Sequence, residues 1–174
     1  MNKDEKGQAA ITDSGTTHLE LLLFSLGNDK RTGRDEVFGV NVFKVREILP
    51  IPEITHAPEM PEGIVGFVSI RQEIIPVMDL QKICGIDTAQ KPSIMIITEY
   101  SNHVHGFLVH KVESIYRLSG SEQRDPPPLL TKKMGGLVTA VSELRDKRLM
   151  MLLDVEKVLS ELSDGEEDND FNMV

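Results

Sequence analysis

The sequence predicts an all-β protein built from two small barrels, and two observations carry this prediction. Short apolar runs of five to eight residues alternate with turn signals, which is typical of a β-barrel or sandwich. These runs cover residues 19–26, 37–42, 64–70, 74–78, 94–98, 104–109, 137–141 and 149–153. The runs also recur in the same order along the chain, which indicates an internal duplication. We therefore expect two similar β-rich units.

The clearest repeat relates residues 37–48 to residues 104–115. Both segments follow the pattern V-x-G-x-x-V-x-K-V-x-x-I, in which six positions agree at an offset of 67 residues. Two more matches follow in order, at residues 63–69 with an offset of 73 and at residues 75–83 with an offset of 75. Ordered matches at similar offsets predict a duplicated unit of about 70–75 residues with about four or five strands. A sheet of this size loses its exposed edges most simply by closing into a barrel.

The predicted boundaries follow from composition. We expect a flexible polar tail at 1–17, a first barrel at about 18–88, a second at about 89–162, and an acidic tail or linker start at 163–174. Proline lacks the amide hydrogen that a central strand must donate, so the Pro-rich residues 50–61 should cross the surface. Residues 125–129 should form an extended connector for the same reason.

Residues shared by the two copies are best explained by the common fold. Gly39 and Gly106 are shared, which predicts a bulge or a close strand crossing at each position. Asp79 and Asp154 are also shared, and each precedes a short apolar segment. An aspartate in that place can cap the first free amides of a helix, so we expect two short helices there.

Residues that differ between the copies are freer to bind a partner. Glu47 aligns with Ser114, and Arg71 aligns with Leu144, so the fold should not require either charge. Both are therefore candidates for partner binding. The alternative is an ordinary pair of solvated surface charges.

Charge and cysteine content exclude several classes of function. The net charge of −9 comes largely from the last fourteen residues, so the folded part is only mildly acidic and carries no basic patch for nucleic acid. Six acids contribute there: Glu161, Asp164, Glu166, Glu167, Asp168 and Asp170. A single Cys84 excludes an internal disulfide, and no signal peptide or membrane-length apolar run is found. We expect a cytoplasmic protein without membrane insertion.

Catalytic and metal-binding motifs are not apparent. No G-x-S-x-G elbow, phosphate loop or H-E-x-x-H motif occurs. His103 and His105 would lie on one strand face, which leaves a metal-dependent enzyme as one hypothesis. The repeat weakens it, because His105 aligns with Phe38 and His110 with Phe43, as expected for rings that pack on strands. We predict no catalytic site, no metal and no cofactor.

Three segments together resemble the CheW family of chemotaxis coupling proteins, and in particular the amino-terminal CheW-like domain of CheV. They are residues 38–48, Gly63-Ile64-Val65-Gly66, and Arg71 with residues 75–80. The similarity runs from about Leu19 to Leu162. It implies two SH3-like five-stranded barrels with short helices, and a scaffold that binds the cytoplasmic tip of a chemoreceptor and the regulatory domain of the histidine kinase CheA.

The resemblance also implies a set of binding residues. They would line a groove between the barrels that receives a helical hairpin. The implied positions are Val45, Glu47, Gly66, Arg71, Ile94, Gly106, Val112 and Ile115.

Two departures from the family pattern affect this site. Ser69-Ile70-Arg71-Gln72 replaces the family's Asn-Leu-Arg-Gly, and residues 28–36 extend the first hairpin. Glutamine adopts a positive φ less readily than glycine, which leaves the direction of Arg71 open.

Several alternatives stay open from the sequence. The CheV family carries a receiver domain after this module, so the chain is either a single-module relative or a fragment. The same domain could also serve another two-component system, such as one that controls surface motility or second-messenger synthesis. Weak self-association is compatible with a small barrel that has partner-binding faces.

Overall fold

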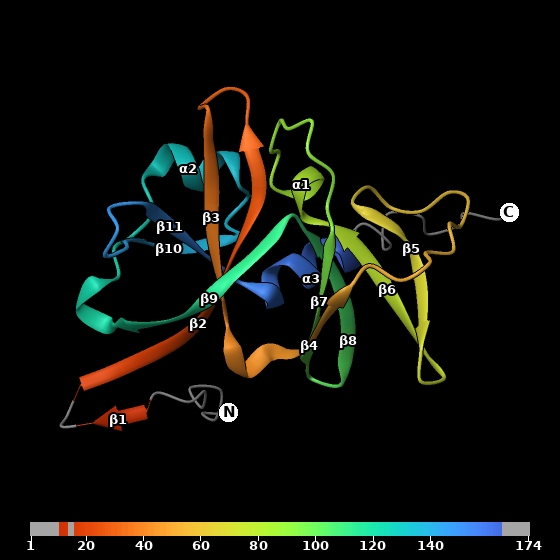
Figure 1. Ribbon diagram of the computed structural model, residues 1–174, viewed down its shortest axis with the longest axis horizontal. Helices are drawn as coiled ribbons and strands as arrows, with labels where there is room; N and C mark the ends of the chain where they lie inside the picture. The colour runs from red at the N-terminus through yellow and green to blue at the C-terminus, as the bar shows by residue number, and fades with distance from the viewer. Residues whose placement is uncertain (1–10, 14–15, 165–174) are drawn as a thin grey trace, which may run out of the picture.

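The computed structural model describes residues 11–13 and 16–164, which form two β-sheets and a few short helices (Figure 1). Sheet A contains β1 (Ile11–Asp13), β2 (Thr16–Asp29), β3 (Arg34–Asn41), β9 (Lys111–Ser119), β10 (Val138–Glu143) and β11 (Leu149–Leu153). Sheet B contains β4 (Val45–Pro50), β5 (Ile64–Ile70), β6 (Glu73–Asp79), β7 (Ile94–Tyr100) and β8 (His103–Val109). The helices are α1 (Leu80–Ile83), α2 (Pro128–Lys133) and α3 (Val155–Asp164), with 3-10 turns η1 (Val42–Lys44) and η2 (Gly120–Glu122).

Each sheet closes on itself through one backbone bridge. Sheet B runs β4-β7-β8-β6-β5, and Thr55, which follows β4, exchanges hydrogen bonds of 2.8 and 2.9 Å with Phe67 on β5. Sheet A runs β9-β2-β3-β11-β10, and Arg124, which follows β9, bridges Val141 on β10 in the same way. The predicted fold of two five-stranded barrels is confirmed.

The predicted barrel boundaries, about 18–88 and about 89–162, are wrong. Sheet A takes β2 and β3 from the first copy but β9, β10 and β11 from the second. Sheet B takes β4, β5 and β6 from the first copy but β7 and β8 from the second. Two strands are thus exchanged between the copies (Figure 1). Periodicity could not reveal this exchange, because equivalent strands of similar sequence can pair with either copy.

The register of the strand pairs supports the duplication. The parallel pairs β11–β3 and β6–β8 are equivalent, and so are the antiparallel pairs β2–β9 and β7–β4. Corresponding positions pair in each case: Leu152 with Gly39 and Val77 with Gly106, then Phe24 with Val112 and Thr98 with Val45. The two barrels are therefore equivalent residue by residue in these regions.

The predicted offset of 73 between β5 and β10 is short by one residue. Asp79 N donates to Gly63 O, and the equivalent Asp154 N donates to Leu137 O, both at 2.9 Å. Leu137 therefore corresponds to Gly63, which gives an offset of 74. The turn that follows β10 is one residue longer than the turn that follows β5, because Ser69 pairs with Ile74 and Glu143 pairs with Leu149.

This shift changes which residue of the second copy corresponds to Arg71. Arg71 corresponds to Arg145, whereas Leu144 corresponds to Ile70, and both of these apolar side chains pack in barrel interiors. A positive charge is thus present in both copies. The inference that only one copy carries it was wrong for Arg71.

Parts of the two predicted tails lie within the described residues. Residues 1–10, 14–15 and 165–174 are not described, but Ile11–Asp13 form β1, Thr16 begins β2 and α3 continues to Asp164. The prediction of an unstructured tail up to residue 17 is therefore wrong at these positions. β1 pairs with the start of β2, with Ile11 opposite His18, where β2 extends beyond β3.

Three apolar cores stabilise the molecule. One fills barrel A, one fills barrel B, and the third lies between the barrels, where α3 contributes Val155 and Val158 (Figure 1). Each fully buried large apolar side chain contributes about 1.5–3 kcal/mol. Barrel A is filled by Leu21, Leu23, Val37, Leu118, Leu144 and Met150, and barrel B by Val68, Ile75, Val77, Met95, Ile97 and Leu108.

The shared glycines and aspartates have the structural roles predicted for them. A Cβ atom on Gly106 would lie 2.7 Å from Met95 Sδ, and one on Gly39 would lie 3.0 Å from Met150 Sδ, so both mark close strand approaches. Asp79 Oδ1 accepts from Gln81 N, and Asp154 Oδ1 accepts from Glu156 N, both at 2.9 Å, which caps α1 and α3.

Candidate functional site

Glu47 and Arg71 form a bidentate ion pair on the surface of barrel B. Arg71 Nη1 donates to Glu47 Oε2 at 2.8 Å, and Nη2 donates to Oε1 at 2.7 Å. The Arg71 side chain is 70% exposed and the Glu47 side chain 29% exposed. The hydrogen bonds from Arg71 lower the pKa of Glu47, so the carboxylate stays charged. The two charges selected from the sequence therefore lie together.

The direction of Arg71 is set by a tight turn. Arg71 and Gln72 form the two-residue loop between the paired residues Ile70 and Glu73, with φ values of 47° and 68°. Two positive φ values are typical of a type I′ hairpin turn. Gln72 thus adopts the conformation that the family glycine would provide, at a cost of about 1 kcal/mol for an L-residue.

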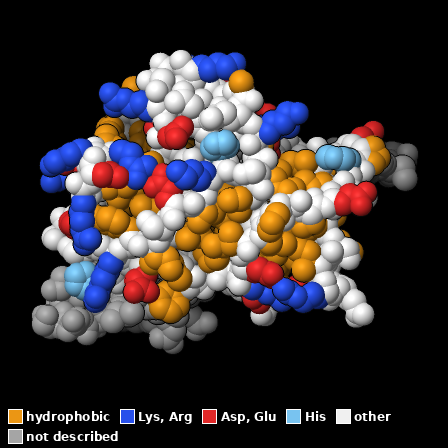
Figure 2. Space-filling view, viewed as in Figure 1, with side chains coloured by type: hydrophobic (Ala, Val, Ile, Leu, Met, Phe, Trp, Pro, Cys, Tyr) orange, Lys and Arg blue, Asp and Glu red, His pale blue; other side chains and the backbone are white. Residues whose placement is uncertain are grey.

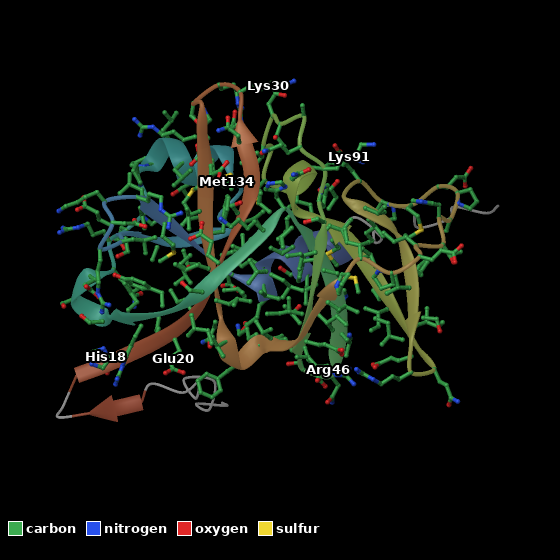
Figure 3. All side chains as sticks on the ribbon, viewed as in Figure 1. His18, Glu20, Lys30, Arg46, Lys91 and Met134 are labelled. Carbon is green, nitrogen blue, oxygen red and sulfur yellow. The ribbon has the colours of Figure 1, made fainter. Side chains whose placement is uncertain are left out.

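A second charged group lies beside this pair. Arg46 Nη1 donates to Glu73 Oε2 at 2.9 Å, and Arg46 Nε lies 3.9 Å from Glu99 Oε2. Exposure alternates along β4, so Arg46 and Ile48 face solvent whereas Val45 and Glu47 are half-buried. Figure 3 labels Arg46, and Figure 2 shows hydrophobic side chains bordering this charged group. One edge of barrel B therefore combines charged and apolar contacts.

Three predicted apolar residues lie at the junction between the barrels, although Val45 pairs with Thr98 at one end of β7 and Ile94 pairs with Pro50 at the other end. Val45, Ile94 and Val112 are half-buried and pack against the core between the barrels. Ile115 lies further along β9 and is 63% exposed. These four residues are therefore partly accessible apolar positions. Ile115 belongs to barrel A, whereas Arg71 belongs to barrel B.

Gly66 and Gly106 do not fit the predicted binding role. Both are buried. A Cβ atom on Gly66 would lie 2.2 Å from Thr55 O, so this glycine allows the bridge that closes barrel B. Close approaches within barrel B therefore explain why both positions are glycine.

The sequence did not single out the exposed apolar residues of the outer barrel surfaces. Ile48 and Ile74 are 43% and 65% exposed, and Leu149 is 62% exposed. Strand alternation indicates two faces but does not say which one lines a barrel interior. A signal was present in the repeat, because Ile48 and Ile115 occupy the same position of the two copies.

Among the described residues, no third ligand joins His103 and His105 to form a metal site. The rings of His103 and His105 are 6.4 Å apart between centroids. Burial, with a smaller effect of His103, lowers the pKa of His105. No group of three His, Cys, Asp or Glu side chains that could hold a metal ion occurs within residues 11–13 and 16–164.

Cys84 is unsuited to nucleophilic chemistry. It is buried in the core between the barrels, and burial raises its pKa to about 12. A thiol with this pKa remains protonated at neutral pH, whereas thiolates are the reactive form. In the described part of the chain, no helix is long and apolar enough to cross a membrane.

Comparisons with known proteins agree with this architecture. The chain is 30% identical to the chemotaxis protein CheV3 of Helicobacter pylori over 92% of its own length and 53% of that protein. It is 26% identical to the chemotaxis protein CheW of Klebsiella aerogenes, covering 83% of this chain and 84% of that protein. The chain thus spans about half the length of the CheV relative and most of the CheW relative.

A solved structure gives the same fold. The crystal structure of the scaffolding protein TtCheW from Thermoanaerobacter tengcongensis matches with a TM-score of 0.68 and 29% identity, over 79% of this chain and 89% of that one. The CheW-like domain family matches residues 20–163. The chain belongs to the CheW-like domain family.

Proposed function

We propose that this chain is a non-catalytic chemotaxis adaptor that couples the cytoplasmic tips of chemoreceptors to the histidine kinase CheA in receptor arrays. The observation that carries the proposal is the bidentate Glu47–Arg71 pair, in which Glu47 lies on the same strand as Val45 at the junction between the barrels. The similarity to chemotaxis proteins and to a scaffolding protein supports it. The protein would act in the cytoplasm, where receptor tips and kinase meet.

The arrangement suits recognition of a helical receptor tip. Val45, Ile94 and Val112 offer apolar contacts that a helix can cover, and Arg71 offers guanidinium hydrogens that Glu47 leaves free. The ion pair already holds the guanidinium in place, so binding would cost less side-chain entropy. A carboxylate on the receptor helix would fix the register of the complex.

The proposal is tested by co-sedimentation with receptor-containing membranes in the presence of CheA, together with an assay of kinase activity. Glu47→Arg and Arg71→Glu should each weaken receptor association at least about tenfold without lowering the melting temperature. Reversing Lys30 and Asp87, an exposed pair 3.9 Å apart where the β2–β3 hairpin contacts the loop between α1 and β7, is the matched control.

Two results would contradict the proposal. One is wild-type protein that neither co-sediments nor changes kinase activity. The other is loss of folding in the Glu47 and Arg71 variants, which would show that the pair is structural.

A further inference from the structure

A pocket of about 190 Å³ lies where the β2–β3 hairpin meets the loop after α1 and the end of α2. The hairpin belongs to barrel A and the loop connects α1 to β7 of barrel B, so the walls come from both barrels. Figure 3 labels Lys30 in the turn of the hairpin and Met134 at the end of α2. The pocket contains none of the residues assigned above to receptor binding.

The inner part of the pocket is apolar and rich in sulfur. Six apolar side chains line it: Phe38, Cys84, Ile86, Leu130, Met134 and Met151. All six belong to the core between the barrels or pack against it. Three of them carry sulfur, which makes favourable contacts with aromatic rings. An aromatic ring is therefore the apolar group that suits this lining best.

The volume of the pocket limits the size of a ligand. An apolar cavity of about 150 Å³ engineered into another protein holds one benzene molecule. The pocket described here is larger by the volume of about one or two non-hydrogen atoms. It can therefore hold a single ring with a short substituent.

Polar side chains form the mouth of the pocket, where Arg31 and Thr32 are exposed and Glu36 is half-buried. The buried Asp29 holds Arg31 in place, because Arg31 Nε and Nη2 donate to its carboxylate at 3.0 and 2.6 Å. Nη2 also donates to Gly85 O at 2.6 Å. Within the described residues, Arg31 Nη1 makes no hydrogen bond. Its hydrogens can thus be donated to an oxygen of a ligand.

The charges at the mouth favour a neutral oxygen group over a carboxylate. Asp29 balances the charge of Arg31, and Glu36 adds one negative charge. A ligand carboxylate would meet this excess negative charge, which is unfavourable. A hydroxyl can accept from Arg31 and donate to Glu36. Glu36 Oε1 accepts from Thr32 Oγ1 at 2.9 Å, and Oε2 makes no hydrogen bond in the described part of the chain.

We propose that this pocket binds a neutral molecule with one aromatic ring and a hydroxyl group. The ring would lie among the sulfur-bearing side chains, and the hydroxyl would lie between Arg31 and Glu36. This site goes beyond the proposed adaptor function and does not depend on it, since binding needs neither receptor nor kinase. Because the walls come from both barrels, a bound ligand would fasten the hairpin to the loop between α1 and β7.

The test is a titration of the full chain with benzyl alcohol, followed by NMR of ¹³C-labelled methionine methyl groups. The signals of Met134 and Met151 should shift with a Kd of about 1 mM or tighter. The signal of Met95, which is buried in the core of barrel B, should not shift and is the internal control. Met134→Leu and Met151→Leu assign the two signals.

Two further probes test the recognition of the hydroxyl. Toluene is more apolar than benzyl alcohol, yet it should bind no more tightly, because the hydroxyl regains in the pocket the hydrogen bonds that it loses in water. Benzoate should bind at least about tenfold more weakly than benzyl alcohol. Glu36→Gln should strengthen benzoate binding at least about threefold, whereas Glu53→Gln, at an exposed acid outside the pocket, should not.

Filling the pocket should abolish binding. Leu130→Phe should weaken benzyl alcohol binding at least about tenfold, and Leu129→Phe, at the neighbouring residue that is 79% exposed, is the matched control. Cys84, the single cysteine of the chain, gives a second measurement that needs no variant. Benzyl alcohol at ten times its Kd should slow the reaction of Cys84 with a thiol reagent about tenfold, because the ligand stabilises the closed form.

Three results would overturn the proposal. The first is a titration in which the Met134 and Met151 signals stay fixed, or in which Met95 shifts equally. The second is tighter binding of toluene than of benzyl alcohol, which would show an unpaired hydroxyl. The third is a folded Leu130→Phe variant that binds as well as the wild type, or a Cys84 reaction that benzyl alcohol leaves unchanged. Failure of receptor coupling would leave these measurements unaffected, so the two proposals can fail separately.

Discussion

At the scale of single residues, the buried Asp29 carries a concentrated set of polar contacts. The residue is only 2% exposed, and its carboxylate accepts from Arg31 Nη2 at 2.6 Å, Arg31 Nε at 3.0 Å and Arg31 N at 2.9 Å. These hydrogen bonds hold the pKa of Asp29 well below its usual value of 3.8. Arg31 Nη2 also donates to Gly85 O at 2.6 Å. One buried carboxylate thus positions the arginine that joins two loops.

Asp29→Asn should reduce the stability of the protein at neutral pH by about 1–2 kcal/mol, because a charged acceptor is lost. The pKa of Asp29 is lowered in the folded state, so its stabilising effect is present above 3.8 and is lost as pH falls below that value. The difference between wild type and variant should therefore shrink in acid. Urea unfolding at several pH values measures it, and the exposed Asp35→Asn is the control.

Gln72→Gly should stabilise the protein by about 0.5–1 kcal/mol, because glycine adopts positive φ without steric strain. Gln72 has a φ of 68°. The matched control is Gln123→Gly at a φ of −79°, where glycine should only add disorder to the unfolded chain and destabilise. Thermal unfolding compares the two variants. Destabilisation by Gln72→Gly would show that the positive φ of Gln72 is not strained.

At the scale of elements, the extended β2–β3 hairpin connects the two barrels. Lys30 N donates to Asp87 O at 2.8 Å, and Asn28 N donates to Gln90 Oε1 at 2.7 Å. Together with the contact from Arg31 to Gly85, these bonds fasten barrel A to the loop between α1 and β7 (Figure 3 labels Lys30). The residues that depart from the family pattern therefore have a structural role in this chain.

Arg31→Ala should loosen this connection, since both the Asp29 and Gly85 contacts are lost. We expect the amide of Lys30 to exchange with solvent at least about tenfold faster. The amide of Leu23 on β2, which lies within the paired region opposite Gly39, should be unchanged and provides the control. Hydrogen exchange measured by mass spectrometry or NMR tests this, and unchanged exchange at Lys30 would contradict it.

The strands were largely predictable from the sequence, but their connections were not. The run at 64–70 coincides with β5, because strand-forming apolar residues are bounded there by a Pro-rich segment and a turn. The predicted run to Val42 instead ends at Asn41, whose side chain accepts from Phe43 N at 3.0 Å and starts η1. That short turn sends the chain into the other barrel, and one asparagine cap is too weak a signal to reveal it.

The same limits apply to the candidate site. Glu47 and Arg71 could be selected because they did not fit the repeat alignment, although the alignment was misplaced for Arg71. For Gly106 the repeat predicted a packing role and the family resemblance a binding role, whereas for Gly66 only the resemblance gave a prediction. The structure shows a packing role for Gly66, because a Cβ atom there would lie only 2.2 Å from Thr55 O.

At the scale of the whole molecule, strand exchange places barrel B, which is formed by β4 to β8, between β3 and β9 of barrel A. Each barrel takes two strands from one copy and three from the other, and four strand pairings join distant parts of the chain: β11–β3, β2–β9, β4–β7 and β6–β8. Many long-range contacts predict slow folding. The core between the barrels predicts one cooperative unfolding transition rather than two.

Residues 18–88 alone and residues 89–162 alone should each fail to fold, because neither contains a complete sheet. Mixed together, the two fragments should form a folded one-to-one complex. Circular dichroism and dispersion of NMR amide signals test both statements. A fragment that folds alone as a monomer would contradict the exchanged topology, and fragments that stay unfolded when mixed would contradict the expected complementation.

The exchange also has a mechanical consequence. The chain passes from one barrel to the other at η1 and again at His110, whose N donates to Ser25 O at 3.0 Å. A force that pulls the barrels apart would therefore act on two connections and on the core between the barrels, rather than on a single tether. Cleavage of one connecting loop by a protease would likewise release neither barrel.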